Sequence, residues 1–165
     1  MEIQKRFGVR LENFVVSFRE NWLWCLTVLA ILVSRICWWT IQNPCKIEND
    51  SKIYIAFQSG DMFAAGVPPL YGMFLDLMEL LFSENFLNAT VIIQTCVSLF
   101  SIYVFSRILL NLGIKTPWCE ICVFLYGVTP AVLGWESCIL TESFSISGSV
   151  AFFYFILLYI RKQNF

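Results

Sequence analysis

The chain has no histidine and little charge. Asp, Glu, Lys and Arg make up only 14% of its 165 residues, against about 25% in a soluble domain. Without histidine, Ser-His and Cys-His nucleophiles and zinc sites with His ligands are excluded. The formal net charge of -1 lacks the cationic excess that nucleic-acid binding requires. A nucleic-acid binder and most classes of soluble enzyme are therefore excluded.

Apolar residues are correspondingly abundant. Hydrophobic residues make up 58% of the chain, which includes 16 Phe and 6 Trp, and the mean hydropathy is +0.70. A compact soluble fold of this size has too little interior to hide so much apolar surface. Lipid must therefore act as the solvent for much of it, and the sequence predicts an integral membrane protein.

Four apolar segments are predicted to span the membrane as helices: residues 22–41, 86–112, 118–135 and 139–160. Twenty helical residues cover about 30 Å, which is the thickness of a bilayer core. Gly127 and Pro130 interrupt the third segment. The predicted fold is all-α, with the whole chain, residues 1–165, forming one multi-pass membrane domain.

Two further segments flank or connect these spans. Residues 1–20 place apolar and basic positions on different helical faces, which predicts an amphipathic lead-in on the membrane surface; a frayed polar lead-in is the alternative. Residues 43–85 form a large outer loop. Its apolar stretch 70–82 would reach only about 20 Å as a helix and contains two acids, so we expect juxtamembrane helices in this loop and not a fifth span.

The charge distribution predicts the orientation. With both termini in the cytoplasm and four spans, eight cations lie inside and two outside, as the positive-inside rule requires. The inner cations are Lys5, Arg6, Arg10, Arg19, Arg107, Lys115, Arg161 and Lys162, and the outer ones are Lys46 and Lys52. Most acids fall near the outer side: Glu48, Asp50, Asp61, Asp76, Glu79, Glu84, Glu136 and Glu142.

The cysteines offer little chemistry. Seven is an odd number, so they cannot all pair. Cys119 and Cys122 form a single Cys-x-x-Cys, and with no second pair and no histidine a metal or redox site is not favoured. We predict no metal site.

Charged residues in or beside the spans are the functional candidates, because ionisable groups are costly in lipid. Arg35 lies within the first span, and Glu142 opens the fourth. Each has a simpler explanation: Arg35 could extend its head to the interface, and Glu142 could complement a helix N-terminus. In the outer loop, Asn49 or Asp50 is the expected N-cap of a short helix, which is the simpler explanation for Asp50.

The outer loop also carries two short motifs. It reads Asp-Ser-x-x-Tyr from Asp50 to Tyr54 and Pro-Pro-x-Tyr from Pro68 to Tyr71. In this order, the motifs resemble the first outer loop of the GT-C glycosyltransferases, which include the protein mannosyltransferases and the lipid A aminoarabinose transferases.

The resemblance extends beyond the loop, to roughly residues 22–162. The Arg in the first span, the Thr-Glu-Ser that opens the fourth and Pro130 in the third are also similar. Two positions depart from the family pattern: Leu70 replaces the usual Gly, and Gly72 replaces the usual Pro.

The resemblance implies transfer of a sugar from a polyprenyl phosphate in the membrane lipid to an acceptor hydroxyl on the non-cytoplasmic side. Asp50 would be the catalytic base, and Arg35, Tyr54 and Glu142 would bind substrate. No cofactor is required, although some relatives use a divalent metal, for which Asp50 and Glu142 would supply oxygen ligands.

Family members normally have many more spans. The chain therefore looks like the N-terminal module of such an enzyme, and we expect its partner to be the remaining C-terminal part and the isolated chain to be inactive. The alternative is a non-catalytic multi-pass protein or accessory subunit whose outer acids only solvate a loop. A transporter fragment is weaker, and rests on the interrupted third span.

Overall fold

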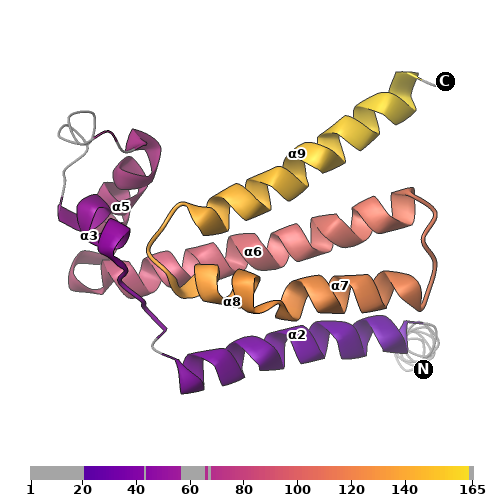
Figure 1. Cartoon of the computed structure of the whole chain (residues 1–165), viewed down its shortest axis with the longest axis horizontal. Coiled ribbons are helices and arrows are strands. Elements are labelled where there is room, and N and C mark those ends of the chain that lie inside the picture. The colour runs from indigo at the N-terminus through magenta and orange to yellow at the C-terminus, as the bar shows by residue number, and fades with distance from the viewer. Residues whose placement is uncertain (1–20, 43, 57–65, 67, 164–165) are drawn as a thin grey trace, which may run out of the picture.

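The computed structural model describes residues 21–42, 44–56, 66 and 68–163, and these form helices without a β-sheet (Figure 1). The helices are α2 (Trp22–Ile41), α3 (Asn49–Ala56), α5 (Pro69–Phe82), the 3₁₀ turn η1 (Ser83–Asn85), α6 (Phe86–Asn111), α7 (Trp118–Val128), α8 (Pro130–Ser137) and α9 (Glu142–Gln163). The all-α prediction is confirmed for this part of the chain. The predicted lead-in at residues 1–20 and Asp61 lie outside the described residues.

Three helical stretches are long and apolar enough to cross a membrane: α2, the stretch Pro69–Asn111 and α9. Helices α7 and α8 qualify together as a fourth, with a bend of 43° between them. Length and composition thus give three or four crossings in the described part of the chain, which is compatible with a multi-pass membrane protein.

Helix α5 does not extend α6 but turns back over it. Ser83 between them has a φ of 49°, in the left-handed region. The Tyr71 hydroxyl donates to Gln94 Oε1 at 3.2 Å, although the two residues are 23 positions apart. In one continuous helix that separation would be about 35 Å. Both residues are buried, so α5 packs against the first turns of α6.

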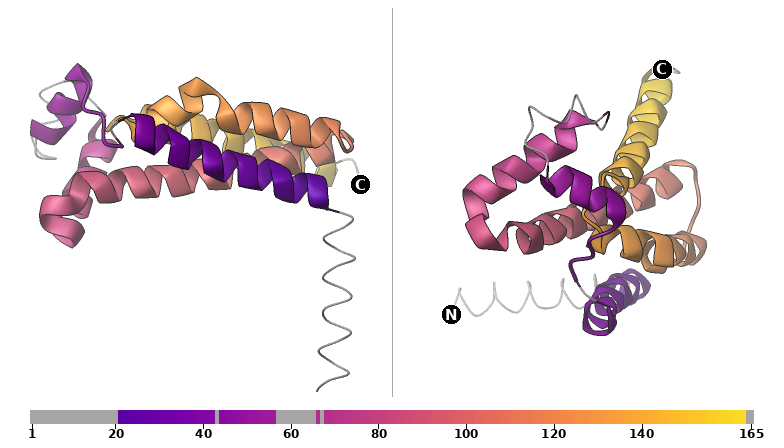
Figure 2. Two further views of the ribbon diagram at one scale, coloured as in Figure 1. Left: turned by 90° about the horizontal axis from the view of Figure 1, so that it is seen from below. Right: turned by 60° about the vertical axis from the view of Figure 1, so that its left-hand side comes forward.

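The long helices run alternately up and down, with α6 in the centre (Figure 1). Helix α6 packs against α5, α7, α8 and α9, while α2 packs against α7. Helix α2 ends, and α6 and α9 begin, at one end of the bundle, where α3 and α5 also lie in each view (Figures 1 and 2). We refer to this as the α3 end. Helix α2 begins and α9 ends at the opposite end.

The third predicted span is broken at Thr129. Pro130 has no N–H to donate to the preceding turn, and the residue before a proline avoids the helical region. Thr129 accordingly has φ -58° and ψ 128°, and Pro130 starts α8 at a position where proline fits well. The break leaves backbone carbonyls at the end of α7 without helical partners.

Helix α9 begins at Glu142, three residues later than predicted. The preceding residues 138–141 form a single β-bridge followed by bends and a turn, because Cys138 pairs with the chain that leaves α2. Lys46 N donates to Ser137 O at 2.8 Å, and Ile139 N donates to Lys46 O at 3.2 Å. Gln94 Nε2 also donates to the Cys138 carbonyl, at 2.9 Å. These tertiary bonds hold residues 138–141 outside the helix and connect the two segments at the α3 end.

Candidate functional site

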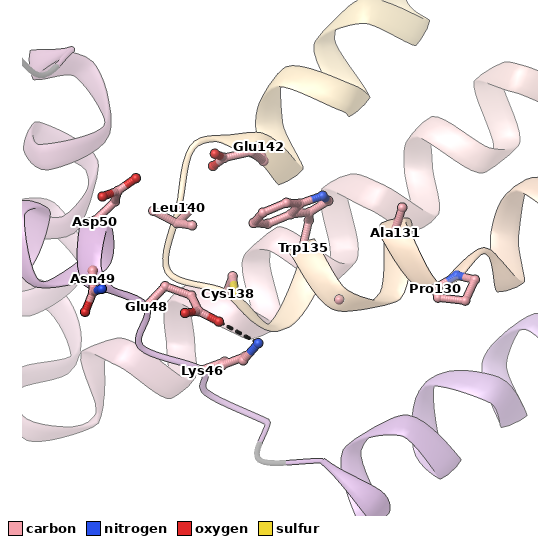
Figure 3. A pocket seen from close by; sticks show the side chains of 11 residues that line it. Lys46, Glu48, Asn49, Asp50, Pro130, Ala131, Trp135, Cys138, Leu140 and Glu142 are labelled. Atoms are coloured by element: carbon pink, nitrogen blue, oxygen red, sulfur yellow. Dashed lines mark ion pairs between the residues drawn. The ribbon is translucent and has the colours of Figure 1, made fainter.

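A cleft of about 700 Å³ opens at the α3 end of the bundle (Figure 3). The segment before α3 and the first turn of α3 form one side, and α8 and the start of α9 form the other. The charged and amide side chains that line it are Lys46, Glu48, Asn49, Asp50 and Glu142. The α8 wall consists of Pro130, Ala131, Gly134 and Trp135. Its size is within the range of small-molecule sites.

Asp50 is presented by the first turn of α3 and is exposed. The sequence predicted Asn49 or Asp50 as the N-cap, but α3 begins at Asn49, and Glu48 occupies the capping position. The Ser51 hydroxyl accepts a hydrogen bond from Glu48 N at 3.0 Å, the reach-back of a capping box. Because Ser51 satisfies this backbone group, the Asp50 carboxylate can face the cleft.

Glu142 enters the cleft from the first turn of α9 and is half-buried. Its Oε2 accepts a hydrogen bond from Thr141 Oγ1 at 3.4 Å. Figure 3 shows Asp50 and Glu142 on different elements on either side of Leu140. The fold therefore brings these two predicted site residues, which are far apart in the sequence, to the same cleft.

The third carboxylate of the cleft is paired. Lys46 Nζ donates to Glu48 Oε1 at 2.5 Å, and this hydrogen bond raises the pKa of Lys46 above its ordinary value. No ion pair joins Asp50 or Glu142 to any residue that the structure describes. The cleft thus has one ammonium group, held by Glu48, and two carboxylates without a cationic partner among the described residues.

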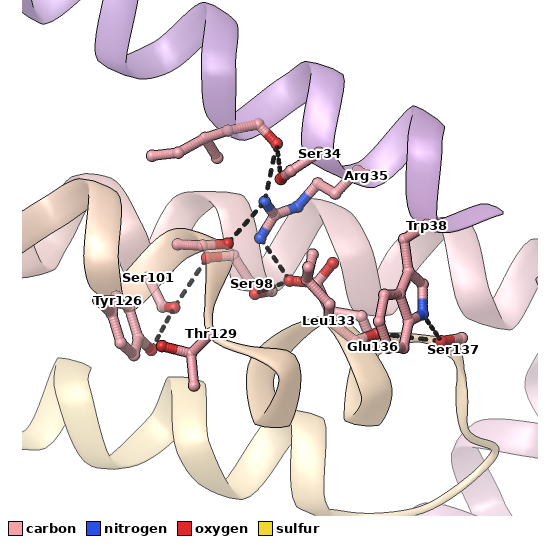
Figure 4. Close-up of polar contacts among 12 residues, drawn as sticks. Ser34, Arg35, Trp38, Ser98, Ser101, Tyr126, Thr129, Leu133, Glu136 and Ser137 are labelled. Carbon is pink, nitrogen blue, oxygen red and sulfur yellow. Dashed lines mark hydrogen bonds and ion pairs between the residues drawn. The ribbon is translucent and has the colours of Figure 1, made fainter. Parts of the chain in front are cut away.

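Arg35 does not line this cleft. It is 4% exposed and forms an ion pair with Glu136, which is 2% exposed, at 2.5 Å between Nη2 and Oε1 (Figure 4). Ser98 Oγ donates to the same Glu136 oxygen, also at 2.5 Å. The predicted role of Arg35 in binding substrate gains no support from this position, because Glu136 already occupies its guanidinium.

The broken span supplies a further partner for Arg35. Its Nη1 donates to the carbonyl oxygens of Ile31 and Gly127, each at 3.1 Å. Gly127 lies at the C-terminal end of α7, where carbonyls are left without helical partners and the helix dipole favours a cation. Arg35 of α2 therefore links the end of α7 to Glu136 of α8.

Sequence reasoning missed this pair. It placed Glu136 among the outer acids, whereas the side chain is fully buried. A signal was present: an arginine inside a span requires a partner, and a glutamate near the end of another span is the natural candidate.

Tyr54 is also outside the residues that line the cleft. It is 7% exposed and packs edge-on against Tyr71, with ring centroids 5.1 Å apart. Tyr71 in turn lies close to Phe74 and Phe144. In this structure, Tyr54 holds α3 against α5 and so supports the cleft without lining it.

The cleft does not offer a metal cage. In the described part of the chain, no three or more His, Cys, Asp or Glu residues are grouped to hold a metal ion. The carboxylates of Asp50 and Glu142 and the amide, beside an indole ring, instead suit the hydroxyl groups of a ligand. The ammonium group of Lys46 suits an anionic group attached to such a ligand.

No protein-family model matches this chain, and no match is found among curated proteins or solved structures.

Proposed function

We propose that the chain is a membrane glycosyltransferase module of the GT-C type, in which Asp50 acts as the base for sugar transfer from a polyprenyl phosphate. The observation that carries the proposal is the position of Asp50 and Glu142 on one cleft. Two separate segments are similar to motifs of the family: the outer-loop motif and the start of α9. The first contributes the Asp50 carboxylate to the cleft, and the second contributes the Glu142 carboxylate.

In the proposed reaction, the acceptor hydroxyl lies against Asp50. As its oxygen bonds to the anomeric carbon, the Asp50 carboxylate takes the proton. The bond from the anomeric carbon to the phosphate oxygen breaks, and polyprenyl phosphate leaves with the electron pair. Glu142 accepts hydrogen bonds from sugar hydroxyls, and Lys46, whose ion pair with Glu48 is exposed, can exchange that partner for the phosphate.

The proposed orientation places the α3 end outside and both termini in the cytoplasm. Among the described cations, Arg107, Lys115, Arg161 and Lys162 lie in or near the ends of α6, α7 and α9 at the opposite end of the bundle, while Lys46 and Lys52 lie at the α3 end. This distribution suits four crossings under the positive-inside rule. Helices α3 and α5 then lie at the outer surface.

Asp50→Asn tests the proposal in cells that produce the protein. Loss of a general base slows transfer by about 10²–10⁴-fold, so the polyprenyl-phosphate sugar should accumulate, and the same accumulation is expected when the gene is deleted. Mass spectrometry of extracted lipids measures the donor, and carbonate extraction measures membrane insertion, which should be unchanged. Glu84→Gln is the matched control, because Glu84 is an exposed acid of η1 outside the cleft.

The alternative, an accessory membrane protein without catalysis, predicts the opposite result. The donor lipid would then remain at its normal level in the Asp50→Asn strain, and Asp50 would be removed from the mechanism. If the donor does not accumulate even in the deletion strain, the transferase proposal fails as a whole.

A further inference from the structure

Trp135 is the aromatic residue among those that line the cleft. It is half-buried, and part of its ring packs against the core cluster that contains Tyr54 and Tyr71. In Figure 3 the indole lies on the α8 wall below Glu142. Its N–H donates to none of the described residues, so it is available to a ligand.

The residues beside Trp135 leave its ring accessible. Pro130, Ala131 and Gly134, which form the rest of the α8 wall, are all small or compact. A Cβ added at Gly134 would have only one heavy atom within reach, Trp38 Cζ2 at 4.0 Å. The cleft therefore offers a ligand the apolar face of the Trp135 ring and the hydrogen-bonding carboxylates of Asp50 and Glu142.

We propose that Trp135 is the platform on which the pyranose ring of the substrate stacks, and that it selects rigid sugar rings over open-chain polyols. The C–H bonds on one face of a pyranose carry partial positive charge, which the negative face of an aromatic ring attracts. The hydroxyls at the ring edge then reach Glu142 and Asp50. The inference rests on the proposed function in taking a sugar as the ligand.

The part of α8 that carries Trp135 is anchored through its neighbouring residues, and the indole packs in part against the core. Glu136, the next residue, is held by Arg35 and Ser98, and Ser137 accepts a hydrogen bond from Trp38 Nε1 at 3.1 Å. A preorganised ring is what a binding surface requires.

Saturation-transfer NMR on the purified protein in lipid nanodiscs tests this proposal without requiring catalysis. The probes are the methyl pyranosides of glucose, galactose and mannose, with sorbitol as an open-chain polyol of similar hydroxyl content. We expect transfer to at least one pyranoside, concentrated on the C–H protons of one ring face, and none to sorbitol.

Trp135→Ala should weaken pyranoside binding about tenfold, the scale of a lost aromatic contact, and Trp135→Phe should retain most of it. Trp135→Leu keeps apolar bulk without the ring and should behave like Ala, which separates stacking from packing if the alanine variant folds poorly. Trp118→Ala is the control, because Trp118 is an exposed residue that starts α7 at the opposite end of the bundle.

Equal binding by the wild type and Trp135→Leu, or no transfer to any pyranoside, would overturn the inference. Ring-dependent binding combined with normal donor-lipid levels in the deletion strain would keep Trp135 as a sugar platform while removing the transferase proposal. The two results are therefore distinguishable.

Discussion

Arg35 and Glu136 form a buried ion pair, whereas the other ion pair among the described residues, Lys46 with Glu48, is exposed. Removing one member leaves the other charge in an apolar interior, which costs about 3–5 kcal/mol. Arg35→Met should therefore lower the free energy of unfolding strongly. Reversible unfolding in mixed micelles at rising SDS fraction measures the change.

The double variant distinguishes a charge effect from a packing effect. Arg35→Met combined with Glu136→Leu removes both charges, and should recover most of the stability that the single change loses. The exchanged pair, Arg35→Glu with Glu136→Arg, should not recover it, because a carboxylate at position 35 would face the Gly127 carbonyl. Recovery by the exchanged pair would show that Gly127 does not orient the interaction.

The candidate site was predictable only in part. Asp50 and Glu142 were identifiable from motifs and from the cost of a carboxylate near lipid, and the structure places both on the cleft. Arg35 was identifiable as unusual, and the position of Glu136 near the end of another span made it a candidate partner, but the sequence alone does not show that two residues 101 positions apart meet. Trp135 lacked any local signal: an aromatic residue near a span end is expected at every membrane interface.

The contact between α2 and α7 depends on the absence of a side chain at Gly127. A Cβ there would lie 2.7 Å from Ile31 Cδ1 and 2.9 Å from its Cγ1, and Ile31 is 2% exposed and has little room to move. Gly127→Ala should therefore destabilise the fold by about 1–3 kcal/mol, as overpacking does, in the same SDS titration.

Two comparisons make this expectation specific. Gly148→Ala in α9 meets no atom within 4 Å and should be neutral or slightly stabilising. Adding Ile31→Ala to Gly127→Ala removes both close atoms, so the pair should cost less than the sum of the two single changes. Strict additivity would contradict a direct contact between these two positions.

The helices differ in how far the sequence determines their ends. Helix α2 has the predicted bounds, because its apolar run begins and ends sharply in the sequence. The start of α9 was placed three residues too early, since Ile139 and Leu140 are as apolar as the helix that follows. They are buried in the core beside the Lys46 pairing, and no periodicity within the segment reveals that partner.

The proposed topology predicts which residues are accessible from outside the cell. A cysteine introduced at Lys52 should react with a membrane-impermeant maleimide added to intact cells, while one introduced at Lys115 should react only after permeabilisation. Both positions are exposed and lie at opposite ends of the bundle. Replacing the exposed Cys37 and Cys96 by Ser lowers the background. Reaction at Lys115 in intact cells would contradict four crossings with cytoplasmic termini.

The distance along the chain between Arg35 and Glu136 has a consequence for biosynthesis. During translation Arg35 emerges 101 residues before its partner, a delay of about 5–20 s at ordinary elongation rates. In the proposed topology, α2 lies in the membrane throughout that interval without Glu136 to pair its guanidinium, and an arginine at a central position costs about 2.5–3.5 kcal/mol on insertion. On the proposed topology, α2 is therefore less stable in the membrane during synthesis than in the finished fold, until α8 brings Glu136 to its guanidinium.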